Sequence, residues 1–443
     1  MPNKSKIISG FSKLSKQQKI DWINSLIHES NDASTLKNQL APPEKTQKIF
    51  DGLSENVISN YILPFSVAPN FLINGKPYCV PMVTEESSVV AAAASAAKYW
   101  AQHGGIKAEV ISMTKLGQVH FCWDGPKKAL LEIWDELVEL FTIATKDLTQ
   151  NMRARGGGIK KIELKDFTKV EPEYYQIMVS FDTKDSMGAN FINSILERIG
   201  DILEDFVGSH PKLKQYHLEV VMAILSNYTP ECIVRASVEC RLDQKELPGC
   251  GQEGSLTFAK KLHKAVRIAE IDPHRATTHN KGIFNGVDAV IIATGNDFRA
   301  VEACGHTFAS RHGQYASLSH CTLTKTSFKF WLDLPLAVGT VGGLTTLHPL
   351  AKLSLELLGN PSAEELMQIV AATGLMQNYA ALKSLVTTGI QHGHMKMHLS
   401  NIINHLEASL QETQDILAHF QEKKVTFTAV REYLASLRQE KVQ

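Results

Sequence analysis

The sequence predicts an α+β fold, in which a small domain of alternating strands and helices is inserted into a large, mostly helical domain. Three observations predict this division. Residues 110–225 switch to short strand-like runs between helices, the segments on either side are mostly helical in pattern, and residues 399–443 are charged, helical in pattern and free of proline. We therefore expect a large domain in two parts, 1–109 and 226–398, the inserted domain between them, and a mobile C-terminal flap at 399–443.

The inserted domain shows the order β-α-β-β-α-β, which is typical of ferredoxin-like domains. Its first helix is amphipathic, since Leu130, Leu137 and Phe141 share one face with other apolar side chains. The expected elements are strands Val110–Met113 and Val119–Trp123, helix Lys127–Leu148, strands Ile159–Leu164 and Tyr175–Phe181, helix Ala189–Val207 and strand Leu218–Ala223.

The first part of the large domain begins with a helix at Gln17–Ile27, in which isoleucines recur at helical spacing. Pro42–Pro43 then interrupts the chain. A second helix opens at Glu86 and continues through an alanine-rich tract to Ala97, which allows close packing. A glutamate in a first turn is favourable to the helix dipole, so this structural role is an alternative to any chemical role for Glu86.

The charge of the chain is balanced. Among 443 residues, 46 lysines and arginines face 46 aspartates and glutamates, and the formal net charge is zero. The pairs Lys160–Lys161 and Lys260–Lys261 are isolated rather than part of a basic block, so no nucleic-acid partner is expected. Met1–Ser15 is polar and lacks the apolar core of a signal peptide, and no run approaches the roughly 18 apolar residues of a membrane span. These features predict a soluble, cytoplasmic protein without a membrane partner.

The number and spacing of the cysteines also predict a cytoplasmic protein. The cysteines are odd in number, and no two of them have the C-x-x-C spacing of a zinc knuckle or a redox dithiol. Such scattered cysteines are typical of a reducing cytoplasm. The seven positions are Cys79, Cys122, Cys232, Cys240, Cys250, Cys304 and Cys321.

The segment from Thr278 to Asp297 places one lysine and one aspartate at the two ends of an apolar run. Lys281 precedes the run, Asp297 follows it, and the run itself, Val287–Ala293, is interrupted only by Asp288. A lysine near a low-dielectric interior either loses its proton or keeps a carboxylate close by, and Asp297 is the obvious candidate for that carboxylate. The alternative is a surface lysine and a loop aspartate that are unrelated.

Five ordered segments carry a resemblance to a known family. They are Glu55–Ile58 with Leu63–Phe65, Pro81–Glu86, Asp185–Asn190, Thr278–Asp297 and Gly389–Met395. Together they resemble hydroxymethylglutaryl-CoA (HMG-CoA) reductases, specifically the class II, bacterial-type branch, and the similarity runs from about Phe11 to about Asn401. The resemblance implies an NAD(P)H-dependent oxidoreductase that converts HMG-CoA to mevalonate and CoA in two reductions, for isoprenoid synthesis.

The resemblance also implies the residues that carry out the reaction. Lys281, held by Asp297, would stabilise the oxyanion that forms from the thioester. Glu86 would supply a proton in the second reduction, and His394 would protonate the departing CoA thiolate. The positions that match contacts to the substrate or to CoA are Arg275, Asn285, Ser88 and Asn227.

The segment Asp185–Asn190 is the candidate for binding a dinucleotide. It joins a strand to a helix, so the helix N-terminus can face a pyrophosphate, although an ordinary capped turn is the alternative. Gly249–Gly254 is a literal G-x-G-x-x-G, but the polar residues before it end in Pro248, which disfavours a Rossmann fingerprint. The resemblance implies binding without a Rossmann fold, through Asp185, Met187, Gly188, Ala189 and Asn190.

The choice between NADH and NADPH depends on the residues before the triple glycine that starts at Gly156. Relatives that prefer NAD place an aspartate there for the ribose 2′-hydroxyl, and Asp147 is a candidate for it. Arg153 and Arg155 lie closer to the glycines and would suit the 2′-phosphate of NADPH instead. We expect use of NADPH or NADH, with NADPH favoured.

Three C-terminal histidines suggest a metal site as an alternative. His394 and His398 would share a helical face, but a zinc site needs a third ligand on that face and His392 points elsewhere, so we expect no metal. A zinc hydrolase built on these histidines and a CoA-binding module without turnover are the two rival functions. The resemblance instead implies a homodimer with the active site at its interface, leaving open a larger assembly of dimers.

Overall fold

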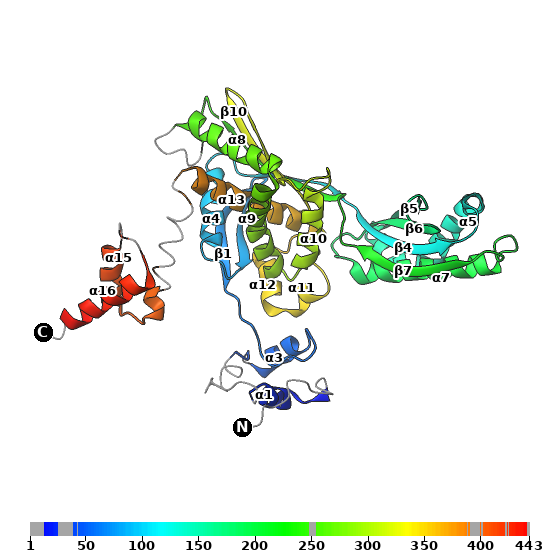
Figure 1. Ribbon diagram of the computed structural model, residues 1–443, viewed down its shortest axis with the longest axis horizontal. Coiled ribbons are helices and arrows are strands. Elements are labelled where there is room, and N and C mark those ends of the chain that lie inside the picture. The colour runs from blue at the N-terminus through cyan, green and yellow to red at the C-terminus, as the bar shows by residue number, and fades with distance from the viewer. Residues whose placement is uncertain are drawn as a thin grey trace.

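The computed structural model of the chain describes residues 13–24, 39–41, 43–247, 254–387, 389, 399, 402–420, 423 and 425–440. A central body of helices and strands carries a small four-stranded sheet at one end (Figure 1). Helices α1 (Lys16–Asn24) and α3 (Glu44–Asp51) lie below this body in the view, and α15 (Leu410–His419) and α16 (Phe427–Glu440) lie on the side away from the small sheet. The chain therefore mixes helix and strand, as an α+β fold requires.

Two long helices, α9 (Pro273–Ala293) and α13 (Ala363–Val386), form the centre of the body. Most of α13 is buried, as expected of a helix whose apolar residues surround its whole axis. The two helices approach closely because glycines face the partner helix. A Cβ on Gly286 would lie 2.8 Å from Cβ of Gln377, and a Cβ on Gly374 would lie 2.8 Å from Cγ2 of Val287. This contact sets polar residues of both helices beside one cavity.

A four-stranded antiparallel sheet lies against these helices in the order β3-β8-β10-β9. Its strands come from distant parts of the chain: β3 (Lys107–Met113), β8 (Cys232–Arg241), β9 (Ser319–Leu323) and β10 (Ser327–Pro335). A hairpin of β1 (Phe65–Ile73) and β2 (Lys76–Val83) packs nearby, and its turn uses Asn74 and Gly75, both with positive φ. The remaining helices of the body are α4 (Val89–Ala101), α8 (Ser255–Ile271), α10 (Phe298–Ala309), α11 (Leu344–Leu347) and α12 (Pro349–Leu357).

The small sheet has the strand order β5-β6-β4-β7, with every neighbouring pair antiparallel. Along the chain its elements follow the predicted β-α-β-β-α-β order, and the first helix is divided in two at Thr145. Aliphatic and aromatic side chains of α5, α7 and the strands form its own core. The elements are β4 (Lys115–Trp123), α5 (Lys127–Ala144), α6 (Lys146–Ala154), β5 (Gly158–Asp166), β6 (Tyr174–Asp182), α7 (Ala189–Ser209) and β7 (Leu218–Ser226).

Two details of the expected organisation are wrong. The strand expected at Val110–Met113 is β3, which pairs with β8 in the large sheet, so the small sheet begins at Lys115 rather than at residue 110. An apolar alternation shows that a strand forms but not which sheet it joins. Glu86 also precedes its helix rather than opening it, because α4 begins at Val89 after Ser88, whose φ is 73°.

The C-terminal end of the described chain has a small apolar core of its own. Ile416, Val430 and Leu434 are buried in a cluster that α15 and α16 share with residues just before them.

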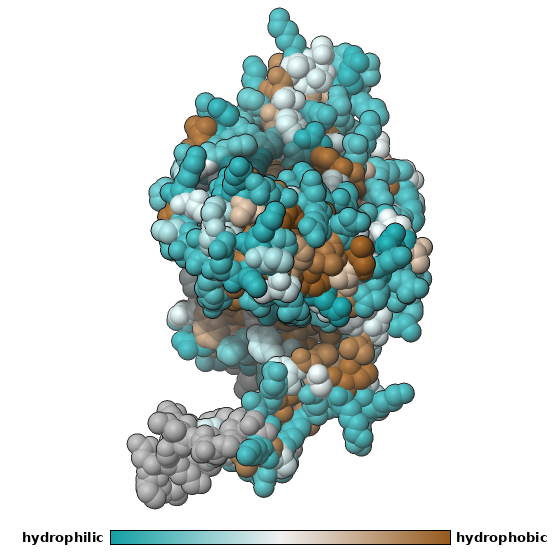
Figure 2. Space-filling view, turned by 90° about the vertical axis from the view of Figure 1, so that its right-hand side faces the viewer, coloured by the Kyte–Doolittle hydropathy of each residue, from teal (hydrophilic) through white to brown (hydrophobic). Residues whose placement is uncertain are grey.

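Seen from the side of the small sheet, most of the surface is hydrophilic, with hydrophobic side chains gathered in a few places (Figure 2). Within the described ranges, none of the helices combines the length and the apolar character needed to cross a membrane.

Candidate active site

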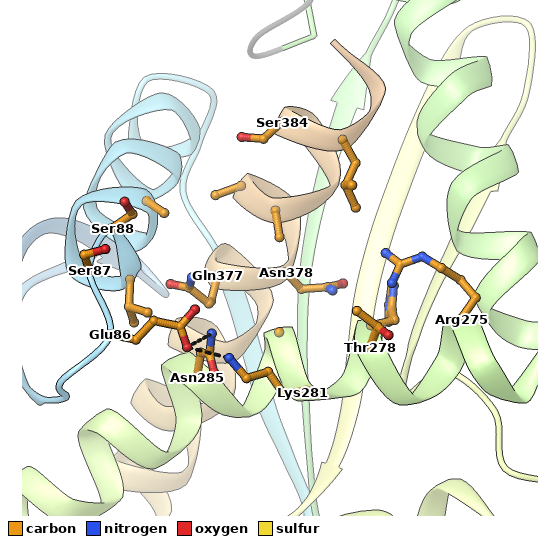
Figure 3. A pocket seen from close by; sticks show the side chains of 17 residues that line it. Glu86, Ser87, Ser88, Arg275, Thr278, Lys281, Asn285, Gln377, Asn378 and Ser384 are labelled. Atoms are coloured by element: carbon orange, nitrogen blue, oxygen red, sulfur yellow. Dashed lines mark hydrogen bonds and ion pairs between the residues drawn. The ribbon is translucent and has the colours of Figure 1, made fainter. Parts of the chain in front are cut away.

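A cavity of about 300 Å³ opens between α9, α13 and the loop that precedes α4 (Figure 3). Glu86 and Ser88 reach it from that loop, and Arg275, Lys281 and Asn285 reach it from α9. Five of the residues expected in the active site therefore lie together, although the loop and the helix are almost 200 residues apart in sequence.

Glu86 is the carboxylate that lies beside Lys281. The ammonium of Lys281 donates to Oε2 of Glu86, and Nδ2 of Asn285 donates to the same oxygen at 3.2 Å. Lys281 and Asn285 are four residues apart and so share one face of α9. The backbone N–H of Glu86 donates to Oγ1 of Thr84 at 3.2 Å, which fixes the loop. The site thus holds a carboxyl group, a cation and an amide around one point.

The expected contact between Asp297 and Lys281 is wrong for a single subunit. Asp297 caps α10, where Oδ1 accepts from the N–H of Arg299 at 3.1 Å and of Ala300 at 3.2 Å, and its carboxylate also pairs with the Arg299 guanidinium. Twelve helical residues, about 18 Å of helix axis, separate Lys281 from the end of α9, and Asp297 lies beyond that end. Spacing along the sequence could not show that one straight helix would carry them apart.

Buried polar contacts fix the first half of α9 in place. Asp272 caps the helix and Pro273 follows at its first position, a common helix start. Asn280 donates to the carbonyl of Ala316 at 2.9 Å and accepts from the N–H of Leu318 at 3.0 Å. His279 bonds Oγ of Ser319 at 2.6 Å, and burial, with the charge of Arg275 adding to it, lowers the pKa of His279 to about 3. A neutral, fixed His279 therefore holds the turn that carries Lys281.

The opposite wall of the cavity comes from α13. Gln377, Asn378 and Ser384 line it, and the sequence analysis did not single them out (Figure 3). Polar residues inside an otherwise apolar helix were the only available signal. Arg275 is half-buried at the rim, and burial lowers its pKa, yet guanidinium groups remain charged in proteins. The cavity therefore offers a permanent positive charge for an anionic substrate group.

A second, larger cavity of about 810 Å³ lies at the start of α7. Met187, Gly188, Ala189 and Asn190 line it together with Asp297. Gly188 precedes the helix with a φ of 85° and leaves its N-terminus without a side-chain cap. First-turn N–H groups and the helix dipole suit a phosphate, so the residues present fit the pyrophosphate of a dinucleotide.

Asp185 has a different position from its expected neighbours. Its Oδ1 accepts from the N–H of Ala363 at 2.8 Å, and its carbonyl accepts from the N–H of Thr340 at 2.8 Å. It does not line the second cavity. In this structure Asp185 ties the loop before α7 to the start of α13.

The residues considered for cofactor choice lie on two faces of α6. Asp147 and Arg153 line a hollow of about 640 Å³ that also contains Arg198. Arg155 lies on the other side, in a hollow of about 390 Å³ that it shares with Ser186 of the loop before α7. Of these three candidates, Arg155 is therefore the one next to the proposed dinucleotide cavity.

Other expected positions lie outside the described residues or away from the cavity that holds Lys281. His394, with His392 and His398, lies outside the described residues, as does Gly249–Glu253 of the glycine-rich loop. Asn227 is exposed directly after β7 and does not line the cavity that holds Lys281. In the described part of the chain, no group of three or more metal-ligating side chains is placed to hold a metal ion.

Comparisons with known proteins point to one family. A family model for hydroxymethylglutaryl-coenzyme A reductase matches residues 15–399. The 3-hydroxy-3-methylglutaryl-coenzyme A reductase of Archaeoglobus fulgidus is 35% identical over 400 residues, covering 89% of this chain and 86% of that protein. A probable reductase of the same name from Borreliella burgdorferi is 35% identical over 356 residues, covering 80% of this chain and 78% of that protein.

A solved structure extends the likeness to three dimensions. The class II 3-hydroxy-3-methylglutaryl-CoA reductase of Streptococcus pneumoniae, bound to NADPH in open conformations, superposes with a TM-score of 0.69 at 38% identity. The match covers 86% of this chain and 100% of that one. Because the family model spans most of the chain and the relatives are similar over most of their own length, this chain belongs to the hydroxymethylglutaryl-coenzyme A reductase family.

Proposed function

We propose that the protein reduces (S)-HMG-CoA to (R)-mevalonate and CoA, consuming two NAD(P)H and two protons and releasing two NAD(P)⁺, as a step of the mevalonate pathway. The observation that carries this proposal is the contact of Lys281 and Asn285 with Glu86 in a cavity that also holds Arg275. The proposed reaction needs these groups around one carbonyl carbon, and their contacts in one cavity support it.

The chemistry follows from the cation beside the carboxyl group. A bound reduced nicotinamide supplies hydride in each of the two reductions. Lys281 stabilises the oxyanion that develops on the thioester oxygen, because its ammonium already lies in the cavity and need not reorganise. Glu86, beside Lys281, supplies the proton that the mevaldehyde oxygen takes up in the second reduction. Protonation of the departing thiolate by His394 rests on the resemblance alone.

Arg275 is proposed to bind the carboxylate of the hydroxymethylglutaryl group. Its guanidinium is half-buried and can form paired hydrogen bonds to a carboxylate. Asn285, Ser88 and the α13 side chains complete the polar lining. This arrangement orients the substrate with its anionic end at the rim and its thioester toward Lys281.

The dinucleotide is proposed to bind at the start of α7, in the small domain. The uncapped helix N-terminus suits the pyrophosphate, and Met187–Asn190 form the wall of the cavity. The Streptococcus pneumoniae relative binds NADPH. Arg155 is the proposed partner of a 2′-phosphate, because it shares a hollow with Ser186, whereas Asp147 and Arg153 face another hollow.

A homodimer is proposed because Asp297, the expected partner of Lys281, lies beyond the far end of α9 within one subunit. Between Ile283 and Ala293, the residues of α9 that are not fully buried are Asn285, Asp288 and Ile292, which form one stripe that continues to Lys281. Two such stripes packed antiparallel about a twofold axis near Asp288 would set Lys281 of one subunit against Asp297 of the other. Exposed leucines on α11 and α12, among them Leu347 and Leu353, would extend this interface.

Three domain roles complete the proposal. The large domain binds HMG-CoA, the small domain binds the dinucleotide, and the C-terminal residues 399–443 close over the site and open for cofactor exchange. Two cofactors must be used in succession, so a segment that opens between the reductions is required. The charged, helical character of α15 and α16 supports this role.

The experiment that tests the function follows the absorbance of the reduced nicotinamide after addition of HMG-CoA, with NADH and NADPH compared. The expected result is two equivalents of NAD(P)H oxidised per HMG-CoA, with free CoA released. Absence of oxidation with both cofactors would refute the proposal. A zinc hydrolase would instead release CoA without oxidising the nicotinamide.

A further inference from the structure

Lys115, the first residue of β4, has its charged end buried against the loop that leads into α7. The residue is only 3% exposed. Its Nζ donates to Oγ1 of Thr183 at 2.6 Å, to the carbonyl of Ser186 at 2.7 Å and to the carbonyl of Met187 at 3.2 Å. Three oxygens match the three protons of an ammonium, and all three belong to one short loop.

The same loop is held from its other side by the large domain. The carbonyl of Asp185 accepts from the N–H of Thr340, and Ser186 forms a parallel bridge with Val341. The backbones approach so closely that a Cβ on Gly339 would lie 2.4 Å from the N of Met187. The loop that ends in Gly188 is therefore held from two sides, by Lys115 of the small domain and by the backbone of the large domain.

Burial and the neighbouring groups act in opposite directions on the charge of Lys115. Burial lowers its pKa, while the nearby carboxylates of Asp182 and Asp185 act in the opposite direction. Burial raises the pKa of the neighbouring Cys232 thiol to about 11, so this group is neutral at physiological pH. Three oxygen acceptors also stabilise the ammonium form. The assignment of an ammonium to Lys115 rests on this geometry, because its Nζ donates to three oxygens of the loop before α7.

We propose that Lys115 is a positioning residue for the dinucleotide: it fixes the carbonyls of Ser186 and Met187 so that the first N–H groups of α7 face the pyrophosphate, and its charge adds to the helix dipole there. The proposal rests on the proposed function for the identity of the ligand. Lys115 makes no contact with the cavity that holds Lys281, so its effect belongs to the cofactor and not to HMG-CoA.

The test compares Lys115→Met with Lys160→Met as a matched control. Lys160 is an exposed lysine at the same crossing between domains, and its Nζ donates to Thr114 at 3.0 Å rather than to the loop. The dissociation constants of NADPH and of HMG-CoA are measured separately on the full-length protein, by NADPH fluorescence and by calorimetry. We expect Lys115→Met to weaken NADPH binding at least tenfold, about 1.4 kcal/mol, and to change HMG-CoA binding less than twofold.

Two further variants keep the result decisive. Lys115→Arg, which keeps the charge and the donors, should recover part of the NADPH affinity. Thr183→Val removes one acceptor of Lys115 without changing the shape of the side chain, and should weaken NADPH binding in the same direction even if Lys115→Met does not fold. Equal losses for both ligands, or unchanged NADPH affinity in a folded Lys115→Met or Thr183→Val variant, would overturn the proposal.

The test is separable from the proposed function. Binding is measured without turnover, so a wild-type protein that binds NADPH but does not oxidise it with HMG-CoA would refute the reductase activity alone. A wild-type protein that turns over normally, with a Lys115→Met variant of unchanged NADPH affinity, would refute the role of Lys115 alone.

Discussion

Replacing Lys281 by alanine should nearly abolish turnover while leaving the binding of HMG-CoA almost intact. The ammonium is the cation that lies beside Glu86 in the cavity, and its removal leaves Asn285 as the remaining donor to that carboxyl group. Loss of one preorganised oxyanion donor typically reduces kcat by about 10²–10³, or about 2.7–4 kcal/mol of barrier. Arg275, which we propose as the carboxylate ligand, is untouched, so affinity should change only a few-fold.

The assay for this variant is steady-state oxidation of NADPH at saturating HMG-CoA, with substrate affinity measured separately by calorimetry. Lys264→Ala, an exposed lysine on the neighbouring α8, is the matched control and should behave as wild type. A kcat for Lys281→Ala within threefold of wild type would refute the assignment. A loss of affinity with an unchanged kcat would mean that Lys281 binds the ground state as strongly as the transition state.

Three other predictions concern the proposed acids, the cofactor and a half-buried carboxyl group of α9. Glu86→Gln should slow the reduction of free mevaldehyde. His394→Gln should slow the reduction of HMG-CoA by about 10²–10⁴ without affecting the reduction of mevaldehyde, because only the first reduction expels a thiolate. Equal losses of rate on both substrates would mean that His394 has a structural role. Arg155→Ala should raise the KM for NADPH well above that for NADH, and Arg153→Ala serves as its control. Equal effects of the two variants on the KM for NADPH would refute the proposed contact of Arg155 with the 2′-phosphate. Burial, with the neighbouring Glu302 carboxylate adding to it, raises the pKa of Asp288 to about 8. Because the pKa of Asp288 is higher in the folded than in the unfolded state, the free energy of unfolding should fall as the pH rises from about 4 to about 8. Asp288→Asn should reduce the difference in that free energy between pH 6 and pH 9, measured by urea unfolding. An unchanged difference between the two pH values would contradict this prediction.

Local patterns were sufficient to predict most of the helices and strands. The amphipathic face around Leu130 and the alternation from Tyr175 to Phe181 report burial directly, because each side chain's exposure follows the period of its own element. Local patterns were not sufficient to predict which sheet each strand joins. β3 has the same alternating pattern whether it pairs with β8 or with β4, and only long-range contacts decide between them.

The candidate site was predicted in part for the same reason. Motifs placed Glu86, Lys281 and Asn285 in one cavity, but the partner of Lys281 depends on where a straight helix ends, so Asp297 was assigned to it wrongly within one subunit. Lys115 escaped notice because nothing in the sequence distinguishes a lysine that starts a strand at the surface from one that is buried. Its role is visible only once the loop from Thr183 to Met187 is folded around its ammonium.

We propose that each active site is completed by two subunits, with Lys281 from one and Asp297 from the other. Coexpression of Lys281→Ala and Asp297→Asn chains with different tags, followed by purification of the hybrid dimer, tests it most directly. Asparagine keeps the helix cap of α10 and removes only the charge. A hybrid has one site with both residues intact and one site with neither, so we expect about half of the wild-type turnover per dimer, while each variant alone is nearly inactive. A hybrid as inactive as its parents would contradict the shared site.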